Sequence, residues 1–351
     1  MTKSERSSIA VVLPIYNVEP YLRDCVDSIL AQTYSNFTVF AIDDGSTDES
    51  GNIIDEYARQ DSRFVVVHQK NSGLSGARNT ALMLIEQRRE YEFIAFIDSD
   101  DKVCPDFLMS LIEYSNKYNS DITVCGYYKF SSNGKIITKS SPGLSGTFDR
   151  DDYIALIFSA LKWKKSSAGG GMVWNKFFRS SVVKGVRFPV NREVIEDEPF
   201  CLEASKNAQT FAYIPDAIYG YRQRLDSLVR NQKFLLRQFE CRKLNMKIAE
   251  QLTEQALYIA TKSFALTAVA LCKSYDSSNL FPYVDLKSLK TKVQDSASHG
   301  FIGNKTLIQY LLFCDYPMCS SLYLLKRRIM RKILFWRDDE KTKSLKEFDL
   351  I

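Results

Sequence analysis

Apolar runs that alternate with amphipathic stretches organise the first 130 residues of the chain. Short apolar runs are typical of strands buried on both faces of a parallel sheet, and they occur at residues 9–15, 37–42, 64–67, 93–97 and 122–130. Helical periodicity fills the intervals, at residues 20–32, 48–59, 76–89 and from about Pro105 onward. Strands that alternate with helices predict an α/β fold with a mostly parallel central sheet and right-handed crossovers.

The rhythm of the sequence changes after residue 130. Ser-Ser-Asn-Gly at residues 131–134 predicts a hairpin turn, and residues 164–171 form a small, polar, glycine-rich linker. From about Asn231 the pattern is helical to the end of the chain. We therefore expect two parts, an α/β domain over residues 1–230 and a helical C-terminal region over residues 231–351.

Acidic residues gather where two of the apolar runs end. The run 93–97 is followed by Asp98, Asp100 and Asp101, and the run 37–42 by Asp43 and Asp44. Open α/β sheets bind ligands beyond the carboxyl ends of their strands, and neighbouring carboxylates repel each other unless a cation or a set of donors compensates them. These residues predict a metal-dependent site for a phosphorylated ligand. The alternative is an acidic loop that only caps the next helix.

Part of the second acidic group has a local explanation. Ser46, with Glu49 three residues later, forms a capping-box pattern, so Asp48 and Glu49 are accounted for by the start of the next helix. Asp43 and Asp44 precede this cap. They are placed to hold a nucleoside base or ribose through charge-assisted hydrogen bonds.

The composition narrows the class of protein. A chain of 351 residues with 45% hydrophobic and 25% charged residues is ordinary for a soluble globular protein, and a net charge of +5 gives no reason to expect nucleic acid as a partner. Eight cysteines without a CxxC pair, and only two histidines, exclude Cys/His zinc spacing and leave no visible Ser-His-Asp or Cys-His system. Buried, reduced thiols fit the cytosol. The polar start of the chain and the lack of an apolar run of about 18 residues predict neither a signal peptide nor a membrane span.

Basic and apolar residues interleave near the C-terminus. Residues 322–336 contain five lysines or arginines among leucine, isoleucine, tyrosine and phenylalanine, and no acidic residue. A basic amphipathic helix of this kind suits an anionic membrane surface, and a solvated terminal helix that packs on the protein is the alternative. We accordingly expect a cytoplasmic protein that lies peripherally on the inner face of the cell membrane.

Five segments, in order, resemble the family 2 glycosyltransferases with the GT-A fold. They are residues 12–17 (Val-Leu-Pro-Ile-Tyr-Asn), 43–48 (Asp-Asp-Gly-Ser-Thr-Asp), 71–79 (Asn-Ser-Gly-Leu-Ser-Gly-Ala-Arg-Asn), 98–101 (Asp-Ser-Asp-Asp) and 196–200 (Glu-Asp-Glu-Pro-Phe). One Asp-x-Asp motif is weak by itself, whereas five segments at these spacings are specific. The resemblance covers about residues 8–225 and implies a GT-A nucleotide-sugar-binding fold, and the last 120 or so residues carry no comparable motif.

The resemblance implies a donor site at the strand ends. In that family these segments hold the nucleoside, the ribose and the diphosphate, so donor-binding roles are implied for Pro14, Tyr16, Asn17, Asp43, Asp44, Arg78, Asp98 and Ser99. Asp44 is the expected partner of the base, and Asp100 the expected ligand of a Mn²⁺ or Mg²⁺ ion that bridges the diphosphate. Arg78 is expected to neutralise the nucleotide site or to hold Asp98 by a bidentate pair. Alternatives are that Pro14 and Tyr16 only shape the strand end, and that Arg78 forms a purely structural ion pair.

The later segments imply the acceptor side. An inverting transfer needs a carboxylate that takes the proton of the acceptor hydroxyl, and Asp197 is the expected base. Acceptor-binding roles are implied for Trp174, Lys176 and Glu196. The alternatives are the acidic first turn of a helix for Glu196 and Asp197, and core packing for Trp174.

These features predict a metal-dependent, inverting glycosyltransferase. It would move a hexosyl or N-acetylhexosaminyl group from a nucleotide-sugar donor, with a UDP-sugar expected, to a hydroxyl of a glycan or lipid-linked glycan in capsule or exopolysaccharide assembly. One alternative is an inactive nucleotide-sugar-binding partner of an assembly complex, which would be expected to lack Asp100 or Asp197. Another is a haloacid-dehalogenase phosphatase, which needs Thr or Val where Lys102 stands. The sequence determines neither the sugar, the linkage and the oligomeric state nor the roles of Arg222 and Arg224.

Overall fold

The chain divides into two compact units, Met1–Ala260 and Thr261–Ile351. The computed structural model describes residues 7–141, 145–158, 170–190, 195–224, 233–257, 259–260, 263–264 and 267. Nearly all of these belong to the first unit, which extends past the expected boundary at residue 230. The basic segment 322–336 and residues 164–169 of the expected linker lie outside the described residues. None of the described helices combines the length and apolarity that crossing a membrane requires.

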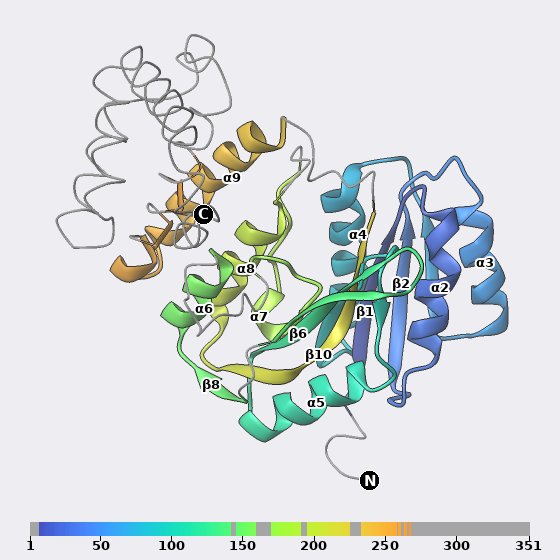
Figure 1. Ribbon diagram of the computed structural model, residues 1–351, viewed down its shortest axis with the longest axis horizontal. Coiled ribbons are helices and arrows are strands. Elements are labelled where there is room, and N and C mark those ends of the chain that lie inside the picture. Colours follow the sequence, from blue (N-terminus) through green and yellow to red (C-terminus); the bar gives the residue numbers. More distant parts are fainter. Residues whose placement is uncertain are drawn as a thin grey trace, which may run out of the picture. The chain divides into compact units, whose positions relative to one another are not determined.

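One mixed sheet forms the centre of the first unit (Figure 1). Its strands are β1 (Ile9–Ile15), β2 (Phe37–Asp43), β3 (Phe64–His68), β4 (Phe93–Phe96), β5 (Lys102–Val103), β6 (Ile122–Ser131), β7 (Ile136–Ser140), β8 (Gly146–Phe148), β9 (Lys176–Arg179) and β10 (Phe211–Gln223). They are ordered β3-β2-β1-β4-β9-β6-β10-β5, with β7 paired to β6 and β8 to β10. The hairpin expected at residues 131–134 is the β6–β7 turn, where Gly134 adopts a φ of 81°.

Helices connect these strands and cover the sheet (Figure 1). They are α2 (Glu19–Leu30), α3 (Ser50–Gln60), α4 (Gly73–Arg88), α5 (Phe107–Tyr118), α6 (Arg150–Ile157), α7 (Ser180–Val183), α8 (Asp197–Asn207) and α9 (Lys233–Ala249). The chain moves outward from β1 to β2 and β3, and then returns through α4 to β4 on the other side of β1. Right-handed crossovers place α4 on the opposite face from α2 and α3 because the direction of movement reverses there. This reversal makes a crevice at the carboxyl ends of β1, β2 and β4, where open α/β sheets bind ligands.

Strands β5, β7, β8 and β9 of the sheet run antiparallel to the strands they pair with, and β9 was not expected from the sequence. β1, β2, β3, β4, β6 and β10 run the same way, whereas β9 lies antiparallel between β4 and β6. Its four residues are too few to show a strand pattern, but their alternation is clear in three dimensions. Phe177 stacks on Phe93 on one face, and Phe178 packs edge-on against Phe96 on the other.

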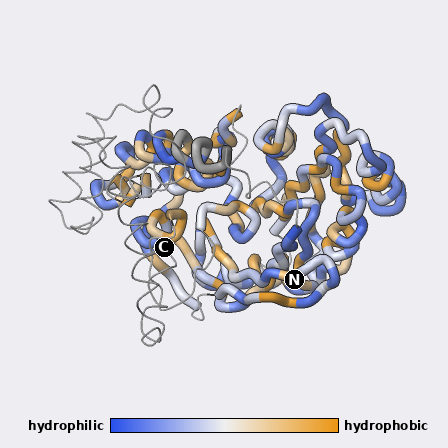
Figure 2. The backbone as a smooth tube through the Cα atoms, turned by 45° about the horizontal axis from the view of Figure 1, so that its top comes forward, coloured by the Kyte–Doolittle hydropathy of each residue, from blue (hydrophilic) through white to orange (hydrophobic). Residues whose placement is uncertain are grey.

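Both faces of the sheet are buried. Val11 and Leu13 of β1 pack toward Leu22 and Val26 of α2. On the other face Phe96 meets an aromatic cluster, with ring centroids 5.9 Å from Phe178, 5.6 Å from Phe188 and 5.6 Å from Phe200. Figure 2 shows the same division, since the inner strands are largely hydrophobic and the outer turns of the helices hydrophilic. Two-sided burial explains why the strands appear in the sequence as continuous apolar runs.

The capping box expected before α3 does not form. Glu49 is the N-cap of α3 and its side chain makes no capping hydrogen bond. Ser46 Oγ instead accepts the backbone N–H of Asn17 at 3.1 Å. Asp48 supplies the cap, because its carboxylate accepts the N–H of Ser50 at 3.0 Å. The serine thus joins two loops of the crevice.

Candidate active site

Asp44 follows β2 and is almost fully buried, with 2% of its surface exposed. Its carboxylate accepts the backbone N–H groups of Ser72 at 2.9 Å and Gly73 at 2.8 Å, and the side-chain amide of Gln69 at 2.7 Å. These bonds satisfy donors at the N-terminus of α4, which have no partner within the helix. The helix therefore begins at Gly73, three residues before the start expected from the sequence at residue 76.

Asp43 is buried at the end of β2 and contacts a histidine. Its Oδ2 lies 2.8 Å from His68 Nδ1, and its Oδ1 accepts the N–H of Ser46 at 3.0 Å. The other ring nitrogen of His68 is 3.1 Å from Asp55 Oδ1. The hydrogen bond to Asp43 raises the pKa of His68. This contact was not predicted from the sequence, although the strand register indicates it, because Asp43 and His68 are paired residues of β2 and β3.

The end of β1 supplies the remaining expected nucleoside contacts. Pro14 is buried within β1 opposite Ile42, so it shapes the strand end. Tyr16 follows the last residue of β1 and is 49% exposed. Asn17 adopts a left-handed φ of 49°, and its side-chain oxygen accepts the N–H of Thr47 at 2.8 Å. Asn17 therefore holds the loops after β1 and β2 together.

The turn after β4 separates its three carboxylates into two kinds. Asp98 and Asp100 have side chains that are 25% and 28% exposed. Asp101 is fully buried and accepts hydrogen bonds from the Tyr219 hydroxyl at 2.8 Å and the Arg222 N–H at 2.7 Å. Asp101 thus anchors the turn to β10, while Asp98 and Asp100 remain available to a ligand.

Buried groups lie around this turn. Ser99 is buried, and the thiol of Cys25 on α2 donates to the Asp98 carbonyl oxygen at 3.6 Å. Burial raises the pKa of the Cys25 thiol well above its usual range, so it stays protonated. All described cysteines are free, as expected for reduced thiols.

Asp98 and Asp100 fit a hard divalent cation. Among the described residues no three His, Cys, Asp or Glu side chains form a ready-made metal cluster. Mg²⁺ bound with a nucleotide generally uses only one or two carboxylates, and phosphate and water complete its coordination. Burial, and then the charge of Asp98, raise the pKa of Asp100 even though Arg224 lies 3.1 Å from its Oδ2. The pair therefore still favours additional positive charge.

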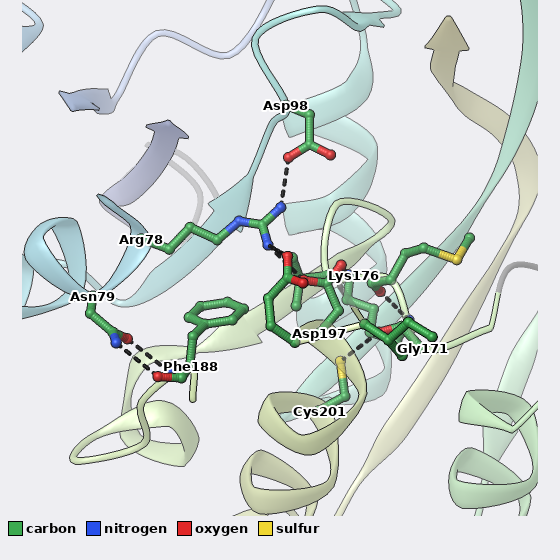
Figure 3. A network of polar contacts seen from close by, with 12 residues as sticks. Arg78, Asn79, Asp98, Gly171, Lys176, Phe188, Asp197 and Cys201 are labelled. Atoms are coloured by element: carbon green, nitrogen blue, oxygen red, sulfur yellow. Dashed lines mark hydrogen bonds and ion pairs between the residues drawn. The ribbon is translucent and has the colours of Figure 1, made fainter. Parts of the chain in front are cut away.

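Arg78 of α4 joins Asp98, after β4, to the acidic pair at the start of α8 (Figure 3). Its side chain is 1% exposed, and its Nη2 donates to Asp98 Oδ1 at 2.7 Å. Its Nη1 donates to Asp197 Oδ1 at 2.6 Å and to Glu196 Oε1 at 3.0 Å. The contact with Asp98 is a single hydrogen bond, not the bidentate pair considered from the sequence. One guanidinium therefore compensates three carboxylates.

The ring of Phe188 supports Arg78 from the side. Arg78 lies over this ring, 5.2 Å from its centroid. The backbone of Phe188 exchanges two hydrogen bonds of 2.8 Å with the side chain of Asn79, the next residue on α4 (Figure 3). Adjacent residues of α4 thus fix both the cation and the ring against which it packs.

Glu196 and Asp197 stand at the start of α8, with side chains 8% and 15% exposed. Burial, followed by the charge of Asp197, raises the pKa of Glu196 to about 7. Burial also raises the pKa of Asp197, while Arg78 opposes that shift. The Oδ2 of Asp197 accepts the N–H of Val173 at 3.1 Å. A partly accessible carboxylate with a raised pKa is suited to accept a proton near neutral pH.

Comparison with known proteins decides the family. The sequence pattern described as "Glycosyl transferase family 2" matches residues 10–187, about half of the chain. The chain belongs to glycosyl transferase family 2. This membership removes the support for the dehalogenase-type alternative, and Asp197 lies beyond the matched residues.

Several proteins resemble this family 2 chain. EpsH of Bacillus subtilis (strain 168), provisionally named a glycosyltransferase, is 34% identical over 237 residues, which are 66% of this chain and 65% of EpsH. A poly(ribitol-phosphate) beta-glucosyltransferase of Bacillus spizizenii is 29% identical over 224 residues, 62% of this chain and 32% of the relative. The match therefore spans less than two thirds of either relative's length.

A solved structure shows the same fold. The crystal structure of S. aureus TarS 1-349 superposes with a TM-score of 0.59 at 19% identity, over 90% of this chain and 88% of that chain. The S. aureus TarS 1-349 complex with UDP-GlcNAc gives the same TM-score at 20% identity. The expected α/β GT-A fold is thereby confirmed.

Two expected acceptor residues of the family 2 chain lie beneath the site. Trp174 is 4% exposed, and its ring stacks 4.4 Å from Tyr219 and 5.5 Å from Tyr221, which is the core packing considered from the sequence. Lys176 is fully buried, and its ammonium donates to the carbonyl oxygens of Gly170 and Met172 and to Asn175 Oδ1. Burial lowers its pKa. An acceptor contact by Lys176 does not fit this position, because its donors already hold the segment 170–175.

Proposed function

We propose that the chain is an inverting glycosyltransferase that moves one sugar from a nucleoside diphosphate to a hydroxyl of a growing glycan. The observation that carries this proposal is the bridge made by Arg78. It holds Asp98, at the strand end suited to a diphosphate, and Asp197, a candidate base, with hydrogen bonds of 2.7 and 2.6 Å. The two carboxylates that such a transfer requires are thereby held by one rigid group.

The nucleoside is assigned to the ends of β1 and β2. Tyr16 offers an exposed ring for the base, while Asp43 and Asp44 line the strand end with Asn17 beside them. A uridine donor is supported by TarS, which has the same fold and whose structure contains UDP-GlcNAc. Because Asp44 already accepts hydrogen bonds from α4, a base would share this carboxylate with the helix.

The chemical step is a displacement at the anomeric carbon. The acceptor hydroxyl gives its proton to the carboxylate of Asp197 as its oxygen forms a bond to the anomeric carbon. The bond from that carbon to the diphosphate oxygen breaks, its electron pair leaves with the nucleoside diphosphate, and the configuration inverts. Asp100, with Asp98, would hold a Mn²⁺ or Mg²⁺ ion that supplies positive charge to the leaving diphosphate.

The acceptor is assigned to bacterial cell-surface glycan assembly. EpsH and the poly(ribitol-phosphate) beta-glucosyltransferase support this assignment as similar proteins, and the second acts on poly(ribitol phosphate) by its name. The basic amphipathic segment 322–336 supports a lipid-linked acceptor at the cytoplasmic membrane face. Replacing Arg327 and Arg328 with Gln in the full chain should weaken binding to anionic vesicles, and equal binding would contradict the membrane role.

The base assignment is tested with UDP-glucose, UDP-galactose and UDP-GlcNAc, each with Mn²⁺, by measuring UDP release. Asp197→Asn should lower turnover by about 100-fold or more while UDP binding is retained. Asp61→Asn is the matched control, because Asp61 is a carboxylate paired with Arg63 away from the site. Unchanged turnover in Asp197→Asn would remove that residue from the mechanism. Binding of UDP without turnover of any donor by the wild-type chain would favour the inactive partner instead.

A further inference from the structure

Helix α9 contacts the chain on both sides of the acidic pair Glu196–Asp197. Before the pair, the thiol of Cys241 donates to the carbonyl oxygen of Ile195 at 3.1 Å. After the pair, Arg242 Nη2 lies 2.9 Å from Glu198 Oε1, and Asn245 Nδ2 donates to Glu198 Oε2 at 2.7 Å. Arg242 and Asn245 are three residues apart, so they project from the same face of α9.

The backbone just before the pair is strained. Ile195 has a φ of 61°, a left-handed conformation that is unfavourable for a β-branched residue. Such conformations persist only where the surroundings hold them, and they are frequent at functional sites. Cys241 of α9 holds the carbonyl of this residue, while Glu196 next to it is the N-cap of α8.

Glu198 is tied to α9 by a buried ion pair. The side chains of Glu198 and Arg242 are 8% and 10% exposed, and Asn245 is fully buried. Removing one member of a buried pair leaves a charge without compensation, so α9 resists any shift of Glu198. The first turn of α8 is therefore held by α9.

Glu198 also influences the position of Asp197 through the segment that contains Gly171. A Cβ placed on Gly171 would come within 2.2 Å of Glu198 Cγ, so the segment 170–173 lies directly on the Glu198 side chain. The same segment supplies the Val173 N–H that binds Asp197 Oδ2 at 3.1 Å. A displaced Glu198 would thus move both the backbone of Asp197 and the donor that orients its carboxylate.

We propose that Arg242 and Asn245 are positioning residues for the catalytic carboxylates, which makes α9 part of the catalytic apparatus. This inference rests on the proposed role of Asp197 as the base. Among the described residues, the ion pairs of Arg78 involve Glu196 and Asp197, and that of Glu198 involves Arg242, so we assign Glu198 to placing the first turn of α8. Both α8 and α9 lie beyond the residues that match the family.

The test compares full-length Arg242→Met, Arg242→Lys and Glu198→Gln with a matched control. Gln251→Met removes the contact of 2.8 Å between Gln251 and Lys206, which joins the far end of α8 to the turn after α9. Arg242→Met should lower kcat for UDP release by about 10- to 100-fold, as expected when a catalytic group is misplaced by about an ångström. The KM for the donor should change less than about twofold, since the donor side is untouched. Arg242→Lys should recover part of kcat, and Gln251→Met should match the wild type.

Hydrogen exchange gives a readout that does not depend on turnover. In Arg242→Met and Glu198→Gln, amides of residues 170–173 and 195–203 should exchange faster, while those of β1 and β2 stay protected. Wild-type kcat or unchanged exchange at both segments would overturn the proposal. Equal loss of UDP binding and kcat, with faster exchange throughout the sheet, would also overturn it because it indicates a general structural role.

The two proposals fail in different ways. If Asp197→Asn turns over normally, the base assignment is wrong, whatever the result for Arg242→Met. If Asp197→Asn is inactive while Arg242→Met keeps full kcat, the base assignment stands and the positioning role of α9 is wrong.

Discussion

The two acidic regions of the crevice are stabilised in different ways. At the ends of β2 and β3, carboxylates meet neutral donors and a partly exposed histidine, as in the bonds of Asp44 to the N-terminus of α4. At the start of α8, carboxylates converge on one buried guanidinium, that of Arg78. In the first region several weak partners share the stabilisation of the negative charge, whereas in the second region it depends on one positive charge. Substitutions should therefore have larger effects at the second region.

The largest expected effect is that of Arg78→Met. It leaves Asp98, Glu196 and Asp197 without their shared cation, and losing one partner of a buried ion pair costs about 3–5 kcal/mol. Urea denaturation at pH 7 measures this loss. Arg23→Met is the control, because the Arg23–Glu56 pair is exposed and screened by solvent, so its loss should barely change the free energy of unfolding. Similar losses of unfolding free energy in both variants would contradict the special importance of the buried Arg78.

Asp44→Ala tests the other region. It removes the acceptor for the N–H groups of Ser72 and Gly73, and loss of a helix cap costs about 0.5–2 kcal/mol. The first turn of α4 should lose protection in hydrogen exchange, and UDP should bind less tightly. Asp44→Asn keeps one acceptor oxygen and should be intermediate. A loss as large as that of Arg78→Met would show that a single residue dominates here too.

The pH dependence of stability tests the buried carboxyl of Glu198 in the second region. Burial raises the pKa of Glu198 to about 7 from its usual 4.5. Between these two pH values the carboxyl is protonated in the native state and ionised in the unfolded state. The contribution of Glu198 to stability is therefore present below about pH 4.5 and is lost as the pH rises through about 7. Glu198→Gln should flatten the fall in unfolding free energy over this range, measured by urea denaturation at pH 5, 6 and 7. Parallel pH dependence in both proteins would contradict it.

The smallest effect is expected for His68→Gln. The His68 side chain is 46% exposed, so its contacts with Asp43 and Asp55 should contribute less than about 1 kcal/mol. Its raised pKa means that this contribution exists below the usual value of 6.5 and disappears as the pH passes the pKa of the folded state. NMR titration, with His299→Gln to assign the signals, should show a lower pKa for His68 in Asp43→Asn. An unchanged pKa would exclude Asp43 as the cause.

Local patterns predicted much of the fold but only part of the site. The apolar run of β1 was placed at its observed bounds, Ile9–Ile15, because burial on both faces leaves a continuous signal. β9 was missed because four residues between two longer strands carry almost no periodicity. Carboxylates at the ends of β2 and β4 could be foreseen from strand order, since parallel strands end at one edge.

Contacts between distant residues could not be foreseen. Arg78 is 118 residues from Glu196 and 119 from Asp197, and no local pattern connects them. The sequence also could not separate Asp101 from Asp98, because the distinction comes from Tyr219 and Arg222 on β10. The segment 196–200 was recognised in the sequence, but no role could be predicted for Glu198 because its partners lie on α9.

The reactivity of the Cys25 thiol can report motion of the turn after β4. This thiol is fully buried below the turn after β4, where it donates to the Asp98 carbonyl. An alkylating reagent can reach it only when α2 and this turn move apart, so the labelling rate of this thiol, followed by mass spectrometry of its peptide, reports how often the turn opens. A bound donor that immobilises the turn should lower the rate at which Cys25 is alkylated.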